Sequence, residues 1–208
     1  MREFIVIDRI LPAAVVCVER LGKPKNTDFE TGRECAREAL QKLGCATTAI
    51  PAGVSGEPLW PEGIVGSITH TREYCAAAAA SVNEVHNLGI DAELHCGLKE
   101  GILEIIANAD EMQMIRQLPK GIYWDAVLFS AKESIYKAWF PSGGPLGWED
   151  VSVVFHPENG TFSAPAPVQL DGRFLITDNF VLTAVTSSRG AEQVASREEE
   201  KFKILCSS

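Results

Sequence analysis

The stretch IVGSITHTREYCAAAAASVNEVHNLGIDAE, residues 64–93, decides the fold that the sequence predicts. It divides into three strand-like segments, IVGSITHT (64–71), YCAAAAASV (74–82) and VHNLGIDAE (85–93), separated by turns of two residues. Short polar turns between apolar segments are typical of antiparallel hairpins. We therefore expect a three-stranded antiparallel meander, although alanine is a weak strand former and the middle segment depends on its neighbours.

Outward from this stretch, the chain alternates helical and strand-like patterns. TDFETGRECAREALQKL (27–43) has apolar residues at helical spacing, Thr27 or Asp28 as a cap, and Gly44 as a terminator. Residues 51–63 are rich in proline and glycine and predict a loop. Further strands are expected at FIVID (4–8), AAVVCVE (13–19), VSVVF (151–155), FSAPAPVQL (162–170) and NFVLTAVTS (179–187), and further helices within 97–118 and 123–140, the last closed by Pro141.

This order of elements, a helix with antiparallel strands twice over, predicts an α+β protein of two similar-sized lobes. The pattern changes near residue 97, so we expect an N-terminal lobe at 1–96 and a C-terminal lobe at 97–208.

Composition limits the classes of function. The net charge of -9 and sequence pI of about 5.0 argue against a general nucleic-acid binder, which is normally basic. No apolar run reaches the roughly 18 residues that a membrane span needs, and Asp8 and Arg9 interrupt the apolar N-terminus, so we expect a cytoplasmic protein. The six cysteines show neither a C-x-x-C pair nor zinc spacing, which favours reduced, buried thiols.

The segment FSAKESIYKAWF (129–140) places charges beside aromatic rings. On a helix, Glu133 and Lys137 lie four residues apart on one face, just past an aromatic edge. An exposed Glu–Lys pair of small energetic value is one interpretation. A functional pair that neighbouring rings shield from water is the other.

The segment GIDAE (89–93) ends a strand-like run with Asp91 and Glu93 on one face. Two adjacent carboxylates repel unless a cation or solvent separates them, and Mg²⁺ is commonly bound by one or two carboxylates plus substrate phosphates. A polar strand end in solvent is the alternative.

Two further segments suit phosphate binding. In GSITHT (66–71) the hydroxyl side chains alternate with Ile68 and His70, and in GRECAREAL (32–40) Arg33 and Arg37 lie one turn apart. Guanidinium groups match phosphate because their donors are held in a fixed fork. Each segment taken alone is equally compatible with ordinary structural or solvated polar residues.

Taken together, these motifs resemble the 4′-phosphopantetheinyl transferase superfamily, in its monomeric two-lobed branch that serves siderophore and other peptide or polyketide synthases. The resemblance is carried by P-L-W-P-E-G-I-V-G-S-I-T-H (58–70), G-I-D-A-E (89–93) and F-S-A-K-E-S-I-Y-K (129–137), and it covers about residues 25–150. It implies two pseudo-symmetric α/β lobes with coenzyme A and a metal ion, Mg²⁺ or Mn²⁺, in a cleft between them. The implied reaction moves 4′-phosphopantetheine from coenzyme A to a serine of an apo carrier protein and releases adenosine 3′,5′-bisphosphate.

The resemblance also implies roles for individual residues. Asp91, Glu93 and Glu133 would hold the metal ion. Glu133 would help to remove the proton of the acceptor serine, directly or through water, and Lys137 would stabilise negative charge near the phosphates.

The remaining implied contacts are with coenzyme A. Lys132 would assist the region around Lys137, and Ser67 and His70 would contact phosphates. Lys25 and Arg33 would grip the nucleotide end. The chain departs from the family pattern at Ser55, where a basic residue is common, and at Lys25, where arginine is common.

Two other classes fit the same residues. A Mg²⁺-dependent phosphodiester hydrolase could use the three carboxylates with water as the acceptor. A non-catalytic coenzyme A binding protein is the second, although it would not need three carboxylates and Lys137.

Overall fold

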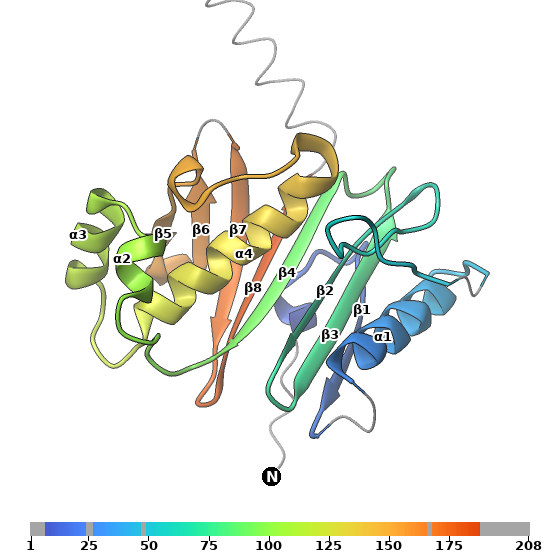
Figure 1. Cartoon of the computed structure of the whole chain (residues 1–208), viewed down its shortest axis with the longest axis horizontal. Coiled ribbons are helices and arrows are strands. Elements are labelled where there is room, and N and C mark those ends of the chain that lie inside the picture. The colour runs from blue at the N-terminus through green and yellow to red at the C-terminus, as the bar shows by residue number, and fades with distance from the viewer. Residues whose placement is uncertain (1–6, 24–26, 47–48, 166–167, 188–208) are drawn as a thin grey trace, which may run out of the picture.

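The computed structural model describes residues 7–23, 27–46, 49–165 and 168–187. Within these ranges the chain forms an α+β fold with two antiparallel sheets, as expected (Figure 1). The helices are α1 (Asp28–Lys42), α2 (Ile102–Ile106), α3 (Ala109–Gln117) and α4 (Trp124–Gly143), with short 3-10 helices η1 (Ile7–Ile10), η2 (Trp148–Asp150) and η3 (Pro157–Asn159). The strands are β1 (Val16–Leu21), β2 (Ile64–Thr71), β3 (Tyr74–Ser81), β4 (Asn87–Leu94), β5 (Val154–His156), β6 (Thr161–Ala164), β7 (Leu170–Ile176) and β8 (Phe180–Ser187).

The first sheet has the order β1-β3-β2 and the second has the order β4-β8-β7-β6-β5. The expected meander is therefore wrong in its third strand, because β4 pairs with β8 and not with β3. The change of sheet falls between β3 and β4, at residues 82–86. A division into lobes at 96 and 97, and their pseudo-symmetry, stay predictions.

Helix α1 covers the first sheet and begins where the sequence predicts. The Thr27 hydroxyl accepts a hydrogen bond from the Glu30 amide, while the Glu30 carboxylate accepts one from the Thr27 amide, which is a capping box. Gly44 follows the helix at φ +79°, a conformation that suits glycine. The buried face of α1, with Cys35, Ala36, Ala39 and Leu40, packs against β3.

Strand β3 explains the run of alanines. Ala77 and Ala79 face α1, while Ala76, Ala78 and Ala80 face a second apolar cluster that also includes residues of η1, β4 and β8. Because both faces of β3 are covered, small side chains allow close packing on both sides and outweigh the low strand propensity of alanine. The start of the chain differs from expectation, since Ile7 and Asp8 lie in η1 rather than in a strand. Residues 4–6 lie outside the described ranges.

Helix α4 lies across the second sheet (Figure 1). Its buried stripe, with Leu128, Ala131, Ile135 and Ala138, packs on the apolar residues of β5 to β8. The helix continues through Pro141 to Gly143 instead of ending before the proline. Among the described residues, no helix is both long and apolar enough to cross a bilayer.

The two sheets meet along β2 and β4, which lie side by side. The amide of Ile90 donates to the Ser67 hydroxyl at 3.0 Å, and the amide of Ala92 donates to the Thr69 hydroxyl at 3.0 Å. Because both residue numbers rise together, the two strands run in the same direction. Side-chain hydroxyls of β2 thus accept hydrogen bonds from edge amides of β4. We call this line of contact between the two sheets the β2–β4 seam.

Candidate active site

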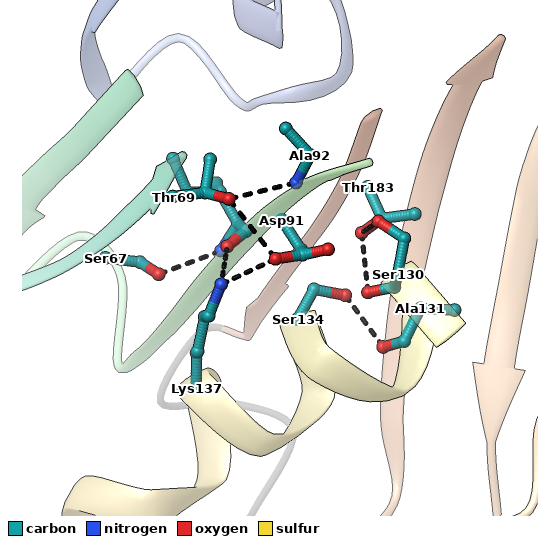
Figure 2. Close-up of polar contacts among 10 residues, drawn as sticks. Ser67, Thr69, Asp91, Ala92, Ser130, Ala131, Ser134, Lys137 and Thr183 are labelled. Atoms are coloured by element: carbon teal, nitrogen blue, oxygen red, sulfur yellow. Dashed lines mark hydrogen bonds and ion pairs between the residues drawn. The ribbon is translucent and has the colours of Figure 1, made fainter. Parts of the chain in front are cut away.

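Asp91 occupies the centre of the candidate site, beside the β2–β4 seam. It is 3% exposed. Its Oδ1 accepts a hydrogen bond from Lys137 Nζ at 2.6 Å and another from Thr69 Oγ1 at 3.2 Å (Figure 2). Its Oδ2 is buried and, within the described part of the chain, has no hydrogen-bond partner. A buried carboxylate oxygen without a partner is costly, so this atom is available for a cation.

Helix α4 approaches this point because Gly89 has no side chain. A Cβ at position 89 would lie 1.9 Å from the carbonyl oxygen of Ser134 and 2.8 Å from the amide nitrogen of Ala138. The backbone of α4 therefore rests directly on β4. This contact explains the glycine of GIDAE, and it brings the face of α4 that carries Glu133 and Lys137 next to Asp91.

A second contact fixes α4 against the sheet. Thr183, the cross-strand partner of Asp91 on β8, donates to the carbonyl oxygen of Ser130 at 2.9 Å, and the two hydroxyl groups also lie 2.9 Å apart. Both side chains are fully buried. Figure 2 shows this pair on the α4 side of the site, close to Asp91.

Burial, and to a lesser extent the neighbouring charges, raises the pKa values of Glu93 and Glu133. Burial is the main cause that raises the pKa of Glu93 to about 7, with Asp91 and Glu133 adding to the rise and Lys137 opposing it. Burial also raises the pKa of Glu133, with Lys137 opposing the rise and Asp91 adding to it. The structure therefore brings the three carboxylates and Lys137 from β4 and α4 within electrostatic reach of one another.

The donor set fits a hard divalent cation in atom type and charge. The three carboxylates within electrostatic reach outweigh the single lysine, and Asp91 Oδ2 lacks a partner among the described residues. In the described residues, however, no three such side chains stand in a ready metal-binding geometry. Lys137 forms an ion pair with Asp91 Oδ1 at 2.6 Å.

Lys137 does not behave as the exposed partner of Glu133. Its ammonium reaches from α4 to β4, where it donates to Asp91 and, at 3.3 Å, to the carbonyl oxygen of Ile90. Both Glu133 and Lys137 are half-buried. The interpretation as an exposed surface pair is therefore wrong, and a functional role for the pair stays a prediction.

Lys132 lies elsewhere, although it precedes Glu133 in the chain. Its ammonium is 2% exposed and donates to the carbonyl oxygen of Ile106 at 2.6 Å, to Glu111 Oε2 at 2.9 Å and to the carbonyl oxygen of Trp148 at 3.0 Å. These contacts use all three of its protons. Lys132 thus joins α4 to the ends of α2 and η2 and to α3, and a contact with phosphate would require this network to break.

The expected phosphate contacts are divided between the core and the surface. Ser67 is buried and its oxygen accepts the amide of Ile90, whereas His70 is exposed, with Nδ1 4.0 Å from Asp28 Oδ2. Arg33 is buried on α1, donates from Nε to the carbonyl oxygen of Ile50 at 3.0 Å, and stacks on Phe29 with Cζ 4.6 Å from the ring centroid. Its Nη2 is buried with no partner in the described ranges. Lys25 lies outside the described residues.

A cavity of about 470 Å³ lies away from these residues. Its lining includes Arg173, Ala184 and Thr186, which lie on the face of the second sheet opposite α4. It therefore does not correspond to the expected cleft between lobes, which stays a prediction.

Sequence reasoning missed the positioning contacts of the site. Thr69 was noted among the hydroxyls of GSITHT but not as a partner of Asp91, and neither Thr183, which supports α4 through a buried hydroxyl, nor Glu111, which anchors Lys132, was singled out. Only Gly89 carried a visible signal, because a glycine inside an apolar strand often marks a close backbone approach.

Comparisons with known proteins agree with this arrangement. Residues 15–80 match the family model described as the 4′-phosphopantetheinyl transferase N-terminal domain, and residues 87–185 match the 4′-phosphopantetheinyl transferase superfamily. The chain is 36% identical to the 4′-phosphopantetheinyl transferase Npt of Nocardia iowensis, over 86% of this chain and 99% of the relative. It is 37% identical to PptT of Mycobacterium tuberculosis, over 84% and 85% of the two chains. It is 35% identical to Svp of Streptomyces mobaraensis, over 86% and 79%.

Proposed function

The chain belongs to the 4′-phosphopantetheinyl transferase superfamily, and from this we infer that it transfers 4′-phosphopantetheine from coenzyme A to a serine of an apo carrier protein. The other product is adenosine 3′,5′-bisphosphate. The observation that carries the assignment to this site is the ion pair of Lys137 with Asp91 where α4 rests on β4, with Glu93 and Glu133 within electrostatic reach.

We propose that Asp91, Glu93 and Glu133 hold Mg²⁺, with Mn²⁺ as a substitute. The unpartnered Oδ2 of Asp91 and the raised pKa of Glu93 support this, because a cation would relieve both. When bound, the ion supplies positive charge to the pyrophosphate of coenzyme A.

The chain's own residues account for the proton and the developing charge. Glu133 takes the proton of the acceptor serine, directly or through a water molecule, and its burial favours that role because a raised pKa makes the carboxylate a stronger base. Lys137 stabilises the negative charge that grows on the phosphate oxygens as the pyrophosphate bond breaks. Its bond to Asp91 holds its ammonium at the metal-binding carboxylates.

We propose that the nucleotide end of coenzyme A binds beside α1 and β2. Arg33 supports this because its Nη2 is buried without a partner in the described ranges, so a phosphate or base acceptor would satisfy it. His70 is exposed near the N-terminus of α1, where an anion is favoured. Ser67 could reach a phosphate only with its remaining hydrogen-bonding capacity, and Lys25 is proposed on its sequence position alone.

The partner is proposed to be a carrier domain of a fatty-acid, polyketide or non-ribosomal peptide synthase, in secondary metabolism. We further propose a cytoplasmic monomer that binds neither nucleic acid nor membranes, in keeping with the net charge of -9.

The test is a mass measurement. Incubation with coenzyme A, Mg²⁺ and an apo carrier protein should increase the carrier mass by one phosphopantetheine, and the matched Glu133→Ala protein should leave the carrier unchanged. Carriers of the peptide, polyketide and fatty-acid types should be compared. An unmodified carrier of every type would contradict the proposal, and cleavage of coenzyme A without a carrier would indicate a hydrolase instead.

A further inference from the structure

Thr69 is the side chain of the first sheet that contacts Asp91. It is 2% exposed and lies on β2, whereas Asp91 lies on β4 of the second sheet. Its hydroxyl accepts the amide of Ala92 at 3.0 Å and lies 3.2 Å from Asp91 Oδ1. A threonine hydroxyl has one proton. Because the amide of Ala92 can only donate, that proton is free to point at Asp91.

The carboxylate of Asp91 is therefore held from two directions. Lys137 reaches Oδ1 from α4, and Thr69 reaches the same oxygen from β2. Both contacts go to Oδ1, so together they fix the rotation of the carboxylate and leave Oδ2 without a partner in the part of the chain that the structure describes (Figure 2). Lys137 alone could not do this, because its long flexible side chain can follow either oxygen.

We propose that Thr69 is the positioning residue of the cation site: its hydroxyl orients Asp91 so that Oδ2 faces the metal ion. This inference rests on the proposed function. Partners of this kind, which do not touch the metal, typically change metal affinity by about 10- to 100-fold when they are removed.

The same hydroxyl links the two sheets. Its bond to Ala92 is one of the two hydroxyl contacts of the β2–β4 seam. The first sheet also carries His70 on β2 and supports α1, which holds Arg33. Thr69 therefore sets the placement of the metal ligand relative to the residues proposed to grip the nucleotide end of coenzyme A.

The experiment compares Thr69→Val with Thr31→Val as its matched control. Both substitutions remove a buried threonine hydroxyl, but the Thr31 hydroxyl lies on α1 and donates to the carbonyl oxygen of Thr27 at 3.0 Å and not to Asp91. Thr69→Ser keeps the hydroxyl, and Thr69→Ala is a second loss of it should valine impair folding. Binding of Mn²⁺ in the presence of coenzyme A, without carrier, is followed by the loss of the free-ion paramagnetic resonance signal. Transfer at varied Mg²⁺ and coenzyme A is measured in parallel.

We expect Thr69→Val and Thr69→Ala to weaken Mn²⁺ binding by about tenfold or more and to raise the half-saturating Mg²⁺ concentration equally. Thr69→Ser should stay within about threefold of the wild type, as should Thr31→Val. Wild-type Mn²⁺ affinity in Thr69→Val, or an equal loss in Thr31→Val or Thr69→Ser, would overturn the role of Thr69 alone. A wild-type protein that neither transfers phosphopantetheine nor binds Mn²⁺ would overturn the proposed function, and the inference with it.

Discussion

Replacement of Gly89 by alanine tests whether the contact between β4 and α4 builds the site. The added Cβ would lie 1.9 Å from the carbonyl oxygen of Ser134, whereas ordinary contacts begin at 3.4 Å, so the helix must move by about 1.5 Å. The obstacle is backbone, which cannot rotate away. Overpacking of this kind costs about 1–3 kcal/mol, which corresponds to about 2–12 °C in melting temperature for a chain of this size.

The effect on activity should be larger than the effect on stability. The displaced helix carries Glu133 and Lys137, and a misplacement of about 1 Å can reduce catalysis by about 100-fold. We therefore expect kcat for carrier modification to fall by about 100-fold, with the secondary structure retained in circular dichroism. The apparent affinity for coenzyme A should change much less, because α1 and β2 do not move.

The matched control is Gly97→Ala. A Cβ at Gly97 would meet the ring of Tyr123 at 3.5 Å, which is ordinary contact, so this variant should keep both stability and activity. The reasoning is refuted if Gly89→Ala melts within about 2 °C of Gly97→Ala and retains kcat within a factor of about three.

Three other predictions follow from the charges. Glu93→Gln should stabilise the protein when divalent ions are absent. The pKa of Glu93 is raised from 4.5 to about 7 in the folded protein, so the stability that protonated Glu93 contributes is fully present below pH 4.5 and is lost as the pH rises through about 7. Urea unfolding should show a gain of about 1–2 kcal/mol at pH 8, allowing for water at this half-buried group, and almost none at pH 4.5; an equal gain at both pH values would contradict it. Lys132→Met should lower the unfolding free energy by about 3–5 kcal/mol because Glu111 keeps a buried charge without its ion-pair partner. Lys42→Met, which breaks an exposed ion pair, should change it by less than about 0.5 kcal/mol. Equal losses in the two variants would show that burial is not the cause. Arg33→Ala should raise KM for coenzyme A by about tenfold or more with little change in kcat, as expected for a lost charge-assisted contact; an unchanged KM would remove Arg33 from the coenzyme site.

Local patterns were sufficient for several individual elements, although Ile7 and Asp8 lie in η1 rather than in a strand and β7 lies almost wholly outside the expected strands. Short segments of sequence were enough to predict the capping residues of α1, the apolar stripe of α4 and the alternating burial in β2. The structure has all three. The four charged residues of the site could be selected from the sequence because the motifs on β4 and α4 resemble those of one family. The structure brings these residues within electrostatic reach of one another.

Pairing over long distances was not visible in the sequence. The short turn before β4 suggested a hairpin with β3, but β4 pairs with β8, whose residues lie about ninety positions later in the chain. Lys132 shows the same limit, since its partner Glu111 is on another helix and nothing near Lys132 signals it. Helical periodicity separates the faces of Lys132 and Glu133, but it does not say which face meets the site.

The apolar cluster beneath η1 decides whether the two halves of the chain could fold separately. The two family matches are successive along the chain, at residues 15–80 and 87–185, which would suit two independent folding units. Yet this cluster includes Ile7 and Ile10 of η1, the alternate alanines Ala76, Ala78 and Ala80 of β3, and Leu88 and Leu182 of the second sheet. A fragment ending after β3 would expose the alanine face of β3 to solvent, and the complementary fragment would expose Leu88 and Leu182. Severed halves should therefore recover structure only when mixed, and the intact polypeptide should melt in one cooperative transition.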